Sequence, residues 1–290
     1  MSSESSTPAR WMRARLGAGE PVVAPGVSDG ISAALAARMG FESIYVSGAG
    51  AAASRGWPDM SIMTLSELVE STRIVTTRSS LPAIVDLDTG YGSAVTIRRA
   101  MRELAAAGAA AVHLEDQPFP RRCGYLTAEP AVPVAEMLDR LAAARAADTE
   151  LVVIARTDAL LNAGLDDACA RVAAYRDAGA DLVMVNGIRS LDELSHVHET
   201  VGAPMLYNVS GSDRSPGLSR SEAAAYGVQV IIYPIQADRA AARAVQQFLQ
   251  TLAERDTVEI PTLMEFTEFM DLAGWSEAQT FDDEVTGDRE

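Results

Sequence analysis

Several features that would assign a chain to a specialised class are missing from this sequence. Only two cysteines, Cys123 and Cys169, occur among its 290 residues, too few for a disulfide framework. No uncharged apolar run approaches the roughly 18 residues that a transmembrane helix needs. The polar N-terminal stretch also lacks the apolar core of a signal peptide. We therefore expect a cytoplasmic protein in a reducing compartment.

Basic residues are in the minority. Lysine and arginine together number 24 against 40 aspartates and glutamates, which gives a formal net charge of −16. Such a surface repels phosphate backbones and anionic lipids, so we expect neither nucleic acid nor a membrane as partner. Hydrophobic residues make up 48% of the chain, which excludes a disordered protein.

Eight short runs of apolar and β-branched residues predict eight strands, at 21–24, 43–47, 82–88, 110–116, 151–156, 181–185, 204–208 and 229–233. Each run is almost continuously apolar, as in parallel strands that are buried on both faces. Ala-rich helical segments lie between them. Thr64 and Glu67 have the spacing of a capping box. Gly40, Gly108 and Gly179 stand where a helix ends just before a strand.

This alternation predicts an α/β protein with a (β/α)8 TIM-type barrel over residues 1–239, including a short helical lead. An open doubly wound sheet is the competing architecture. Residues 240–290 are predicted to form a C-terminal helical segment, longer than one barrel helix needs, that packs on a neighbouring subunit. The last ten residues, FDDEVTGDRE, are expected to form an acidic tail in solvent.

Polar side chains gather where the predicted strands end, which is where a barrel of this kind holds its active site. In the segment VDLDTGYG, Asp86 and Asp88 are two residues apart and would point the same way from a strand. With Glu115 from the next strand they predict an oxygen-rich site for Mg²⁺, with Mn²⁺ as an alternative. Helix capping by these carboxylates is the competing interpretation.

Six segments, in order, carry a family resemblance: YVSGAGAAAS, GWPDM, VDLDTGYG, HLEDQ, RRCGY and IARTDA. Their order and spacing over roughly residues 20–240 resemble the isocitrate lyase/phosphoenolpyruvate mutase superfamily. The likeness is to its short members, which include 2-methylisocitrate lyase, 2,3-dimethylmalate lyase, oxaloacetate hydrolase and carboxyphosphonoenolpyruvate phosphonomutase. The resemblance implies a (β/α)8 barrel, a small carboxylate substrate, and a homo-oligomer, usually a tetramer, with helix-swapped dimer pairs.

The resemblance also implies roles for individual residues. Asp86 would contact Mg²⁺, while Asp59, Asp88 and Glu115 would hold its waters. The 2-oxo acid half of the substrate would be held by Tyr45, Ser47, Gly48 and Ala49. Arg156 would be the cation that faces substrate carboxylate, and Tyr45 and a metal-bound hydroxide are the candidate bases. The segment RRCGY resembles the family's mobile loop, in which Cys123 would protonate the departing carbanion and Gly124 would allow closure.

Elementary chemistry supports an acid at Cys123. Arg121 and Arg122 flank this cysteine in the sequence, and neighbouring cations favour a thiolate. We therefore expect the pKa of the Cys123 thiol to be lowered toward neutral pH. Cys169, in an Ala-rich helix, is predicted to be a small core residue.

Three positions depart from the family pattern. Tyr125 replaces the loop histidine, Asn186 replaces a glutamate, and the segment after residue 207 keeps only Asn208 and Ser215–Pro216 of the usual motif. These positions would meet the far end of the substrate, so we expect a substrate other than 2-methylisocitrate.

The sequence thus predicts a Mg²⁺-dependent lyase that cleaves a 2-hydroxy di- or tricarboxylate to a 2-oxo acid and a carboxylate. Three alternatives remain at this point: hydrolysis of oxaloacetate, chemistry at a phosphorus–carbon bond, and a non-catalytic protein that binds a metabolite.

Overall fold

The computed structural model describes residues 7–127, 129–210, 215–255, 257 and 263–287. Eight parallel strands form one sheet in the order β1-β8-β7-β6-β5-β4-β3-β2. The strands are β1 (Val22–Pro25), β2 (Ile44–Val46), β3 (Ala83–Asp86), β4 (Ala109–Glu115), β5 (Val152–Thr157), β6 (Leu182–Val185), β7 (Met205–Asn208) and β8 (Val228–Tyr233). An isolated bridge between Gly26 and Tyr45 joins the two edges. The predicted barrel is confirmed, and the open sheet is excluded.

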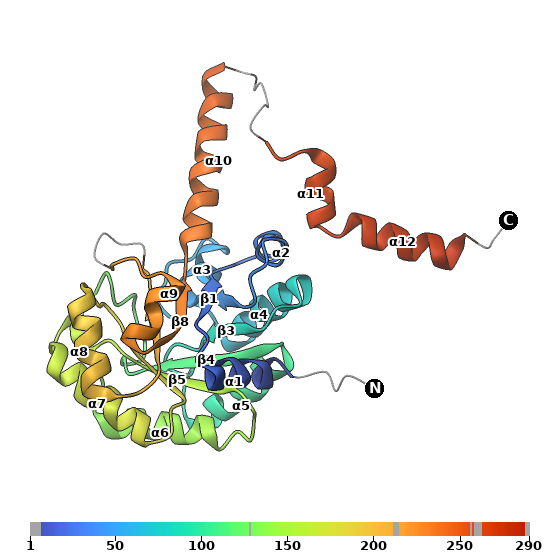
Figure 1. Ribbon diagram of the computed structural model, residues 1–290. Helices are drawn as coiled ribbons and strands as arrows, with labels where there is room; N and C mark the ends of the chain where they lie inside the picture. The colour runs from blue at the N-terminus through green and yellow to red at the C-terminus, as the bar shows by residue number, and fades with distance from the viewer. Residues whose placement is uncertain (1–6, 128, 211–214, 256, 258–262, 288–290) are drawn as a thin grey trace.

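Helices surround the barrel between successive strands (Figure 1). They are α2 (Gly30–Arg38), α3 (Gly48–Ala53), α4 (Leu65–Ser79), α5 (Ala94–Ala106), α6 (Val134–Arg145), α7 (Leu165–Asp177), α8 (Leu191–Val201) and α9 (Arg220–Ala223), with 3₁₀ turns at Ala159–Leu161 and Ala224–Tyr226. The predicted capping box of Thr64 and Glu67 opens α4. Gly40, Gly108 and Gly179 have φ of +80°, +92° and +95°, the left-handed region that favours glycine.

The core has two layers. One lies between the strands and the surrounding helices. The other fills the barrel interior, where Met12 of α1 (Pro8–Ala18) packs with strand residues such as Ile84 and Met184. Because α1 contributes the fully buried Met12 to this interior, the helical lead is part of the barrel, and the polar ends of the strands are left to build a site at the opposite mouth.

The chain leaves the barrel after β8. Helix α10 (Gln236–Arg255) has no buried residue and extends away from the barrel, and α11 (Phe266–Leu272) and α12 (Trp275–Thr286) follow it (Figure 1). Within α11, Leu272 is buried, and Arg78 of α4 donates hydrogen bonds to the carbonyls of Asp271 and Leu272. The extension is therefore attached to its own barrel through α11, while α10 itself is uncovered.

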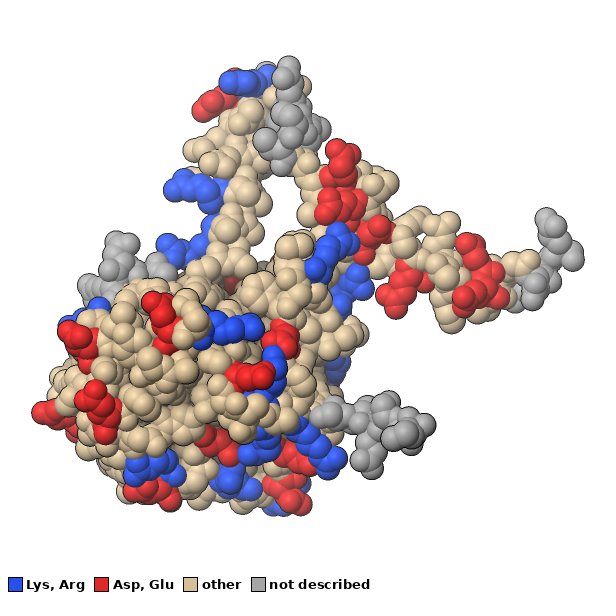
Figure 2. Space-filling view, viewed as in Figure 1, with Lys and Arg blue, Asp and Glu red and all other residues tan. Residues whose placement is uncertain are grey.

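The C-terminal residues differ in one respect from the expectation. The predicted acidic tail is helical as far as Thr286 in α12, with exposed side chains, and acidic groups are prominent along α11 and α12 (Figure 2). Residues 288–290 lie outside the described part. No helix in the described ranges has the length and apolar character that crossing a membrane requires.

Candidate active site

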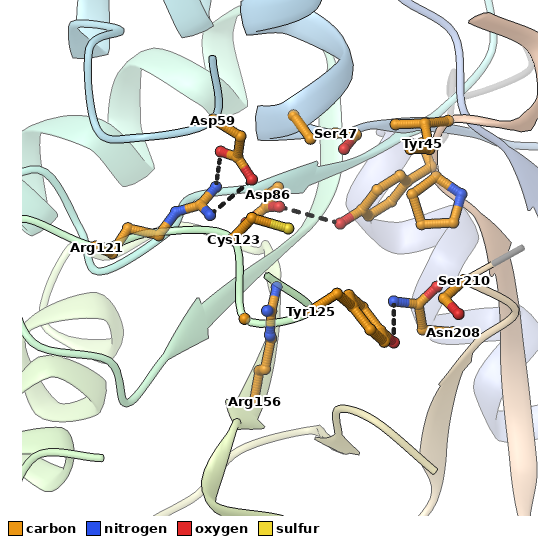
Figure 3. Close-up of a pocket in the computed structure, with 14 residues that line it drawn as sticks. Tyr45, Ser47, Asp59, Asp86, Arg121, Cys123, Tyr125, Arg156, Asn208 and Ser210 are labelled. Carbon is orange, nitrogen blue, oxygen red and sulfur yellow. Dashed lines mark hydrogen bonds and ion pairs between the residues drawn. The ribbon is translucent and has the colours of Figure 1, made fainter. Parts of the chain in front are cut away.

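A pocket lies at the carboxyl end of the barrel (Figure 3), where barrels of this kind hold their active sites. Strand ends and the loops that follow them build its wall. The predicted site residues that line it are Tyr45, Ser47, Ala49, Asp59, Asp86, Cys123, Gly124, Tyr125, Arg156 and Asn208. Residues as distant in sequence as Tyr45 and Asn208 thus meet because parallel strands end at one mouth.

The other predicted residues lie behind this lining. The Gly48 amide faces Asp86 Oδ2 at 3.4 Å, and Asn186 accepts a hydrogen bond from Tyr125. Ser215 is connected to the pocket through Ser210, whose Oγ is 2.7 Å away. Asp88 and Glu115 belong to a buried ionic cluster.

Asp86 and Asp88 are not two residues of one strand, contrary to the prediction from the sequence. Strand β3 ends at Asp86, and Asp88 lies in the following loop with φ of +50°. Aspartate tolerates this left-handed conformation because its side chain can bond locally, and here the Asp88 amide donates to Asp86 Oδ1 at 3.1 Å. Both carboxylates still belong to one buried cluster, in which Arg121 contacts Asp88 and influences Asp86.

Arg121 is the centre of the buried ionic cluster, a role that sequence reasoning missed. Its side chain is 3% exposed and contacts three carboxylates: Asp59 at 2.7 Å, Asp88 at 2.5 Å and Glu115 at 3.5 Å. These partners come from three separate loops or strand ends, and only the fold brings them together. The only sign of this role in the sequence was the position of Arg121 within the motif RRCGY.

The cluster carries more acid than its arginines neutralise. Burial is the largest influence that raises the pKa of Asp88, to about 7, and of Glu115, well above its ordinary value. Burial acts in the same direction on Asp86, but His113, which is protonated in the acidic range where Asp86 titrates, and then Arg121 outweigh it and lower its pKa to about 2. An added cation would therefore be stabilised here, since it would favour the ionised form of every one of these groups.

The donor set fits a hard divalent cation. Oδ1 of Asp88 and both oxygens of Glu115 accept no hydrogen bond from the described residues, although each lies within ion-pair distance of an arginine. Within the described ranges, no three His, Cys, Asp or Glu side chains are placed so that together they could hold a metal ion directly. Carboxylate oxygens are the ligands of Mg²⁺, which retains several waters and needs few direct contacts. The chemistry thus fits Mg²⁺, with Arg121 among the carboxylates that would surround it.

Tyr45 and His113 form a stacked pair beside Asp86. Their ring centroids are 5.7 Å apart, the Tyr45 hydroxyl lies 2.5 Å from His113 Nε2, and the same hydroxyl donates to Asp86 Oδ2 at 3.4 Å. Burial, then Asp86, raises the pKa of Tyr45 well above its usual value, while burial lowers that of His113 to about 4. Both side chains are therefore neutral at pH 7, so Tyr45 orients Asp86 and is a poor proton acceptor.

Arg156, at the end of β5, is held in a fixed orientation. Its Nε and Nη2 each donate to the Asp158 carboxylate at 3.0 Å, and its Nη1 lies 3.1 Å from Glu115 Oε2. Such a bidentate pair fixes the plane of a guanidinium. Of its five N–H bonds, two remain for a ligand, in keeping with its predicted role.

The loop that carries Cys123 passes close to the barrel. The Cys123 amide donates to the Asp59 carbonyl at 3.2 Å, and the Cys123 carbonyl accepts from Leu126 and Thr127. A Cβ on Gly124 would lie 2.9 Å from Asp158 Oδ2, so this position requires glycine for the close approach. A larger residue than Gly124 would therefore keep the loop from lying this close to the barrel, which is a steric reason for the role predicted for Gly124.

The prediction that the pKa of the Cys123 thiol is lowered is wrong. Burial, opposed by the Tyr125 amide, raises the pKa of the Cys123 thiol. Arg121 forms ion pairs with the buried carboxylates. The side chain of Arg122 is 52% exposed and lies 3.9 Å from Glu129. Arg121 does lower the pKa of the thiol, but its influence is smaller than that of burial and of the nearby Asp59 carboxylate, which both raise it. A protonated thiol remains compatible with an acid role. Cys169 is buried in α7, as predicted.

Uncharged groups form the remaining wall of the pocket, as far as its residues are described. The Tyr125 hydroxyl donates to Asn186 Oδ1 at 2.9 Å and accepts from Asn208 Nδ2 at 3.3 Å. Ser210, Pro234 and Ile235 complete this side; none of the three was singled out from the sequence. The two positions that depart from the family pattern, Tyr125 and Asn186, are therefore bonded to each other.

Comparison with known proteins agrees with this architecture. A model of the phosphoenolpyruvate phosphomutase family matches residues 12–253. The chain is 37% identical over 267 residues to 2-methylisocitrate lyase of Aeropyrum pernix, covering 91% of this chain and 87% of that protein. The structure of 2,3-dimethylmalate lyase, 33% identical, matches with a TM-score of 0.90 over 96% of this chain and 95% of that one.

A further solved structure is a phosphonopyruvate hydrolase in complex with oxalate and Mg²⁺. It is 29% identical, with a TM-score of 0.86, and covers 95% of this chain and 98% of that one. With the family model spanning most of the chain and the fold shared throughout, the protein belongs to the phosphoenolpyruvate mutase/isocitrate lyase superfamily of enzymes.

Proposed function

We propose that the protein is a Mg²⁺-dependent carbon–carbon lyase that cleaves a small 2-hydroxy di- or tricarboxylate to a 2-oxo acid and a carboxylate. One observation carries this proposal: Cys123, Arg156 and the carboxylate of Asp86 line a single pocket at the barrel mouth. Two of the similar proteins, from Aeropyrum pernix and in the 2,3-dimethylmalate lyase structure, are lyases by name.

Mg²⁺ would be held by Asp86, with Asp59, Asp88 and Glu115 holding its waters. Bound there, it would polarise the oxygens of the 2-oxo acid half as a Lewis acid. The complex of phosphonopyruvate hydrolase with oxalate and Mg²⁺ supports this cofactor.

The chain's own groups account for binding. Ser47, Gly48 and Ala49, at the end of β2, would hold the carboxylate and oxo group of the 2-oxo acid half. Arg156 would orient a second carboxylate through its two remaining N–H bonds. The loop with Gly124 and Tyr125 would exclude water from the reacting atoms.

Cys123 would supply the proton that the reaction needs. A base removes the proton of the 2-hydroxyl, the bond between C2 and C3 breaks, and its electron pair moves to the C3 fragment. The Cys123 Sγ–H then donates its proton to that carbon. Because burial raises the pKa of this thiol, the proton is in place at neutral pH. The neutral, hydrogen-bonded Tyr45 is not assigned as the base.

An NMR assay with purified protein and Mg²⁺ tests the proposal. The substrates would be 2-methylisocitrate, isocitrate, substituted malates, oxaloacetate and phosphonopyruvate. Formation of a 2-oxo acid and a carboxylate from a hydroxy acid, lost in Cys123→Ser and retained in Cys169→Ser, would support the lyase. Silence across the panel would contradict it.

Hydrolysis on the same site is the second candidate, favoured by the similarity to phosphonopyruvate hydrolase. Turnover of oxaloacetate or phosphonopyruvate alone would establish it in place of the lyase. A protein that only binds a metabolite would show neither turnover nor stabilisation by Mg²⁺ with oxalate.

We also propose that two copies exchange α10. Its exposed apolar residues fall on one face at helical spacing: Val245, Phe248, Leu249 and Leu252. Exposed apolar surface of this kind marks an interface. A second barrel is the partner that fits, because α10 follows β8, where a barrel helix is due, and yet has no buried residue, although Gln236 and Asp238 in its first turn hydrogen-bond to the Val209 carbonyl and to Ser28. A tetramer would then be a pair of such dimers.

A further inference from the structure

Arg140 of α6 is a buried cation that does not line the pocket. Its Nη1 donates hydrogen bonds to two backbone carbonyls, that of Glu115 at 2.8 Å and that of Gln117 at 2.9 Å. Its Nη2 donates to Glu136 Oε1 at 2.6 Å, one turn earlier in the same helix. A guanidinium can serve several acceptors at once because its five N–H donors are fixed in one plane.

The two carbonyls need a donor because the sheet no longer supplies one. The register of β3 with β4 ends at Asp86, and the chain turns aside at Asp88, whose φ is +50°. Glu115 and Gln117 are nevertheless buried, and a buried carbonyl without a partner is costly. Arg140 therefore completes the hydrogen bonding of a strand end that has lost its neighbour.

The first carbonyl belongs to a member of the buried ionic cluster. The Glu115 side chain lies within ion-pair distance of Arg121 and Arg156, and the Glu115 amide donates to the Asp88 carbonyl at 3.0 Å. With Arg140 on its carbonyl, the backbone of Glu115 is bonded at both its N–H and its C=O. The groups that orient the residues around a metal contribute to metal affinity, so this backbone position matters for the proposed Mg²⁺ site.

The second carbonyl belongs to Gln117, from which the loop that carries Cys123 departs. Gln117 Oε1 accepts a hydrogen bond from the Arg122 amide at 3.4 Å, one residue before the cysteine. A shift of the Gln117 backbone would therefore displace the start of this loop. The bond from Arg140 opposes such a shift.

The same short segment also receives the end of the loop. The Val132 amide donates to the Asp116 carbonyl at 2.8 Å, and α6 begins two residues later, at Val134. Residues 115–117 thus join the buried ionic cluster to both ends of the loop, and Arg140 bonds the two outer carbonyls of this segment.

We propose that Arg140 is a positioning residue. Through the carbonyls of Glu115 and Gln117 it holds the carboxylates on the metal side and the Cys123 loop in one arrangement, so that its loss disturbs metal binding and loop placement together. The inference rests on the proposed Mg²⁺-dependent lyase, and Arg140 itself contacts neither substrate nor metal in it.

The test uses Mn²⁺ alone as the probe, because electron paramagnetic resonance measures its binding without turnover. Arg140→Met removes the donors and keeps an apolar side chain of similar reach. We expect its Kd for Mn²⁺ to rise about tenfold, the effect of losing an outer support of a metal site. In chelator, alkylation of Cys123 by iodoacetamide, followed by mass spectrometry, should become several-fold faster because the loop is held less firmly. Arg140→Lys, which keeps a charged donor, should recover part of both properties.

Arg102→Met is the matched control. Arg102 Nε on α5 donates to the Ala147 carbonyl, just beyond the end of α6, at 3.0 Å, so this variant also loses a bond from a guanidinium to a backbone carbonyl. It should lower the melting temperature as Arg140→Met does, while Mn²⁺ affinity and Cys123 alkylation stay as in the wild type. Glu136→Gln, which alters only the partner of Arg140 Nη2, should likewise leave both unchanged.

Wild-type Mn²⁺ affinity and alkylation in Arg140→Met, with a lowered melting temperature, would overturn the inference and leave Arg140 a structural role only. So would a change in only one of the two properties in protein that binds Mn²⁺. If Arg140→Met does not fold, Arg140→Lys decides: intermediate values support the inference, and wild-type values overturn it.

Failure of the proposed function would look different. A wild type that binds no Mn²⁺ would contradict the metal-dependent lyase, and alkylation of Cys123 would then decide on the inference alone. Faster alkylation in Arg140→Met than in the wild type would support the hold on the loop, and an equal rate would overturn it.

Discussion

The Tyr125 hydroxyl donates a hydrogen bond to Asn186 Oδ1 at 2.9 Å, and this bond ties the loop that carries Cys123 to the end of β6. The same hydroxyl accepts from Asn208 at the end of β7. One phenol therefore connects the loop to two strands, two residues away from the sulfur that is proposed to donate the proton.

The first prediction concerns this connection. Tyr125→Phe removes both hydrogen bonds while keeping the ring, so the loop should open more often. We expect kcat to fall by roughly three- to tenfold, which corresponds to about 1 kcal/mol of lost hydrogen bonding. The rate of Cys123 alkylation by iodoacetamide should rise several-fold, a change that mass spectrometry would measure at Cys123.

Tyr226→Phe is the matched control, because Tyr226 lies in a 3₁₀ turn before β8 and does not line the pocket. It should leave both rates unchanged. Faster turnover in Tyr125→Phe, or alkylation equal to that of the wild type, would show that the hydrogen bonds do not hold the loop.

The second prediction is the pH dependence of Cys123 itself. Burial raises the pKa of its thiol, so the thiolate should be rarer at pH 7 than for an ordinary cysteine, whose pKa is about 8.5. Only the thiolate reacts with iodoacetamide. In protein treated with a chelator, alkylation should be slow at pH 7 and should rise with pH through a midpoint above that of a model thiol. A midpoint below about 8 would contradict it.

The third prediction concerns Arg121. Arg121→Gln removes the cation from the contacts with Asp59, Asp88 and Glu115, and a buried charge pair that loses one partner destabilises a protein by about 3–5 kcal/mol. In the presence of a chelator, the free energy of unfolding of Arg121→Gln should be lower than that of the wild type by up to this amount. Mg²⁺ should then stabilise the variant more than it stabilises the wild type, because the cation replaces the missing charge.

Arg122 gives the control for that experiment, one residue away. Its side chain is half-exposed and lies 3.9 Å from Glu129, a contact of little energetic value. The free energy of unfolding of Arg122→Gln should equal that of the wild type, both with and without Mg²⁺. An Arg121→Gln variant that Mg²⁺ fails to stabilise would argue against metal binding among these carboxylates.

Much of the fold could be predicted from the sequence because the signals are local. The strands are continuous apolar runs, and the start of α4 is set by Thr64 and Glu67, three residues apart. Tyr125 and Asn186 were identified as departures from a pattern, and the structure places them in contact. The assignment of the remaining site residues to substrate or metal stays a prediction.

The wrong predictions arose where three-dimensional surroundings, rather than neighbours in the sequence, set the outcome. Because Arg121 is close to Cys123 in the sequence, it was predicted to favour the thiolate of that cysteine. In the structure it forms ion pairs with Asp59, Asp88 and Glu115, which the barrel brings together. Burial, which no short motif reveals, then decided the direction of the Cys123 pKa. The acidic composition of residues 281–286 likewise concealed a helix.

The last prediction concerns the exchanged helix. Phe248 and Leu252 lie one turn apart on the exposed apolar face of α10, so the double change Phe248→Asp and Leu252→Asp would place two charges in the interface. Buried unpaired charges are costly, and the oligomer should dissociate toward the 30.7 kDa protomer, as measured by light scattering after gel filtration. Gln247→Asp adds a charge on the opposite face and should leave the mass unchanged. A double variant that keeps the wild-type mass would place the interface elsewhere, and a wild type that is already monomeric would rule out the exchange.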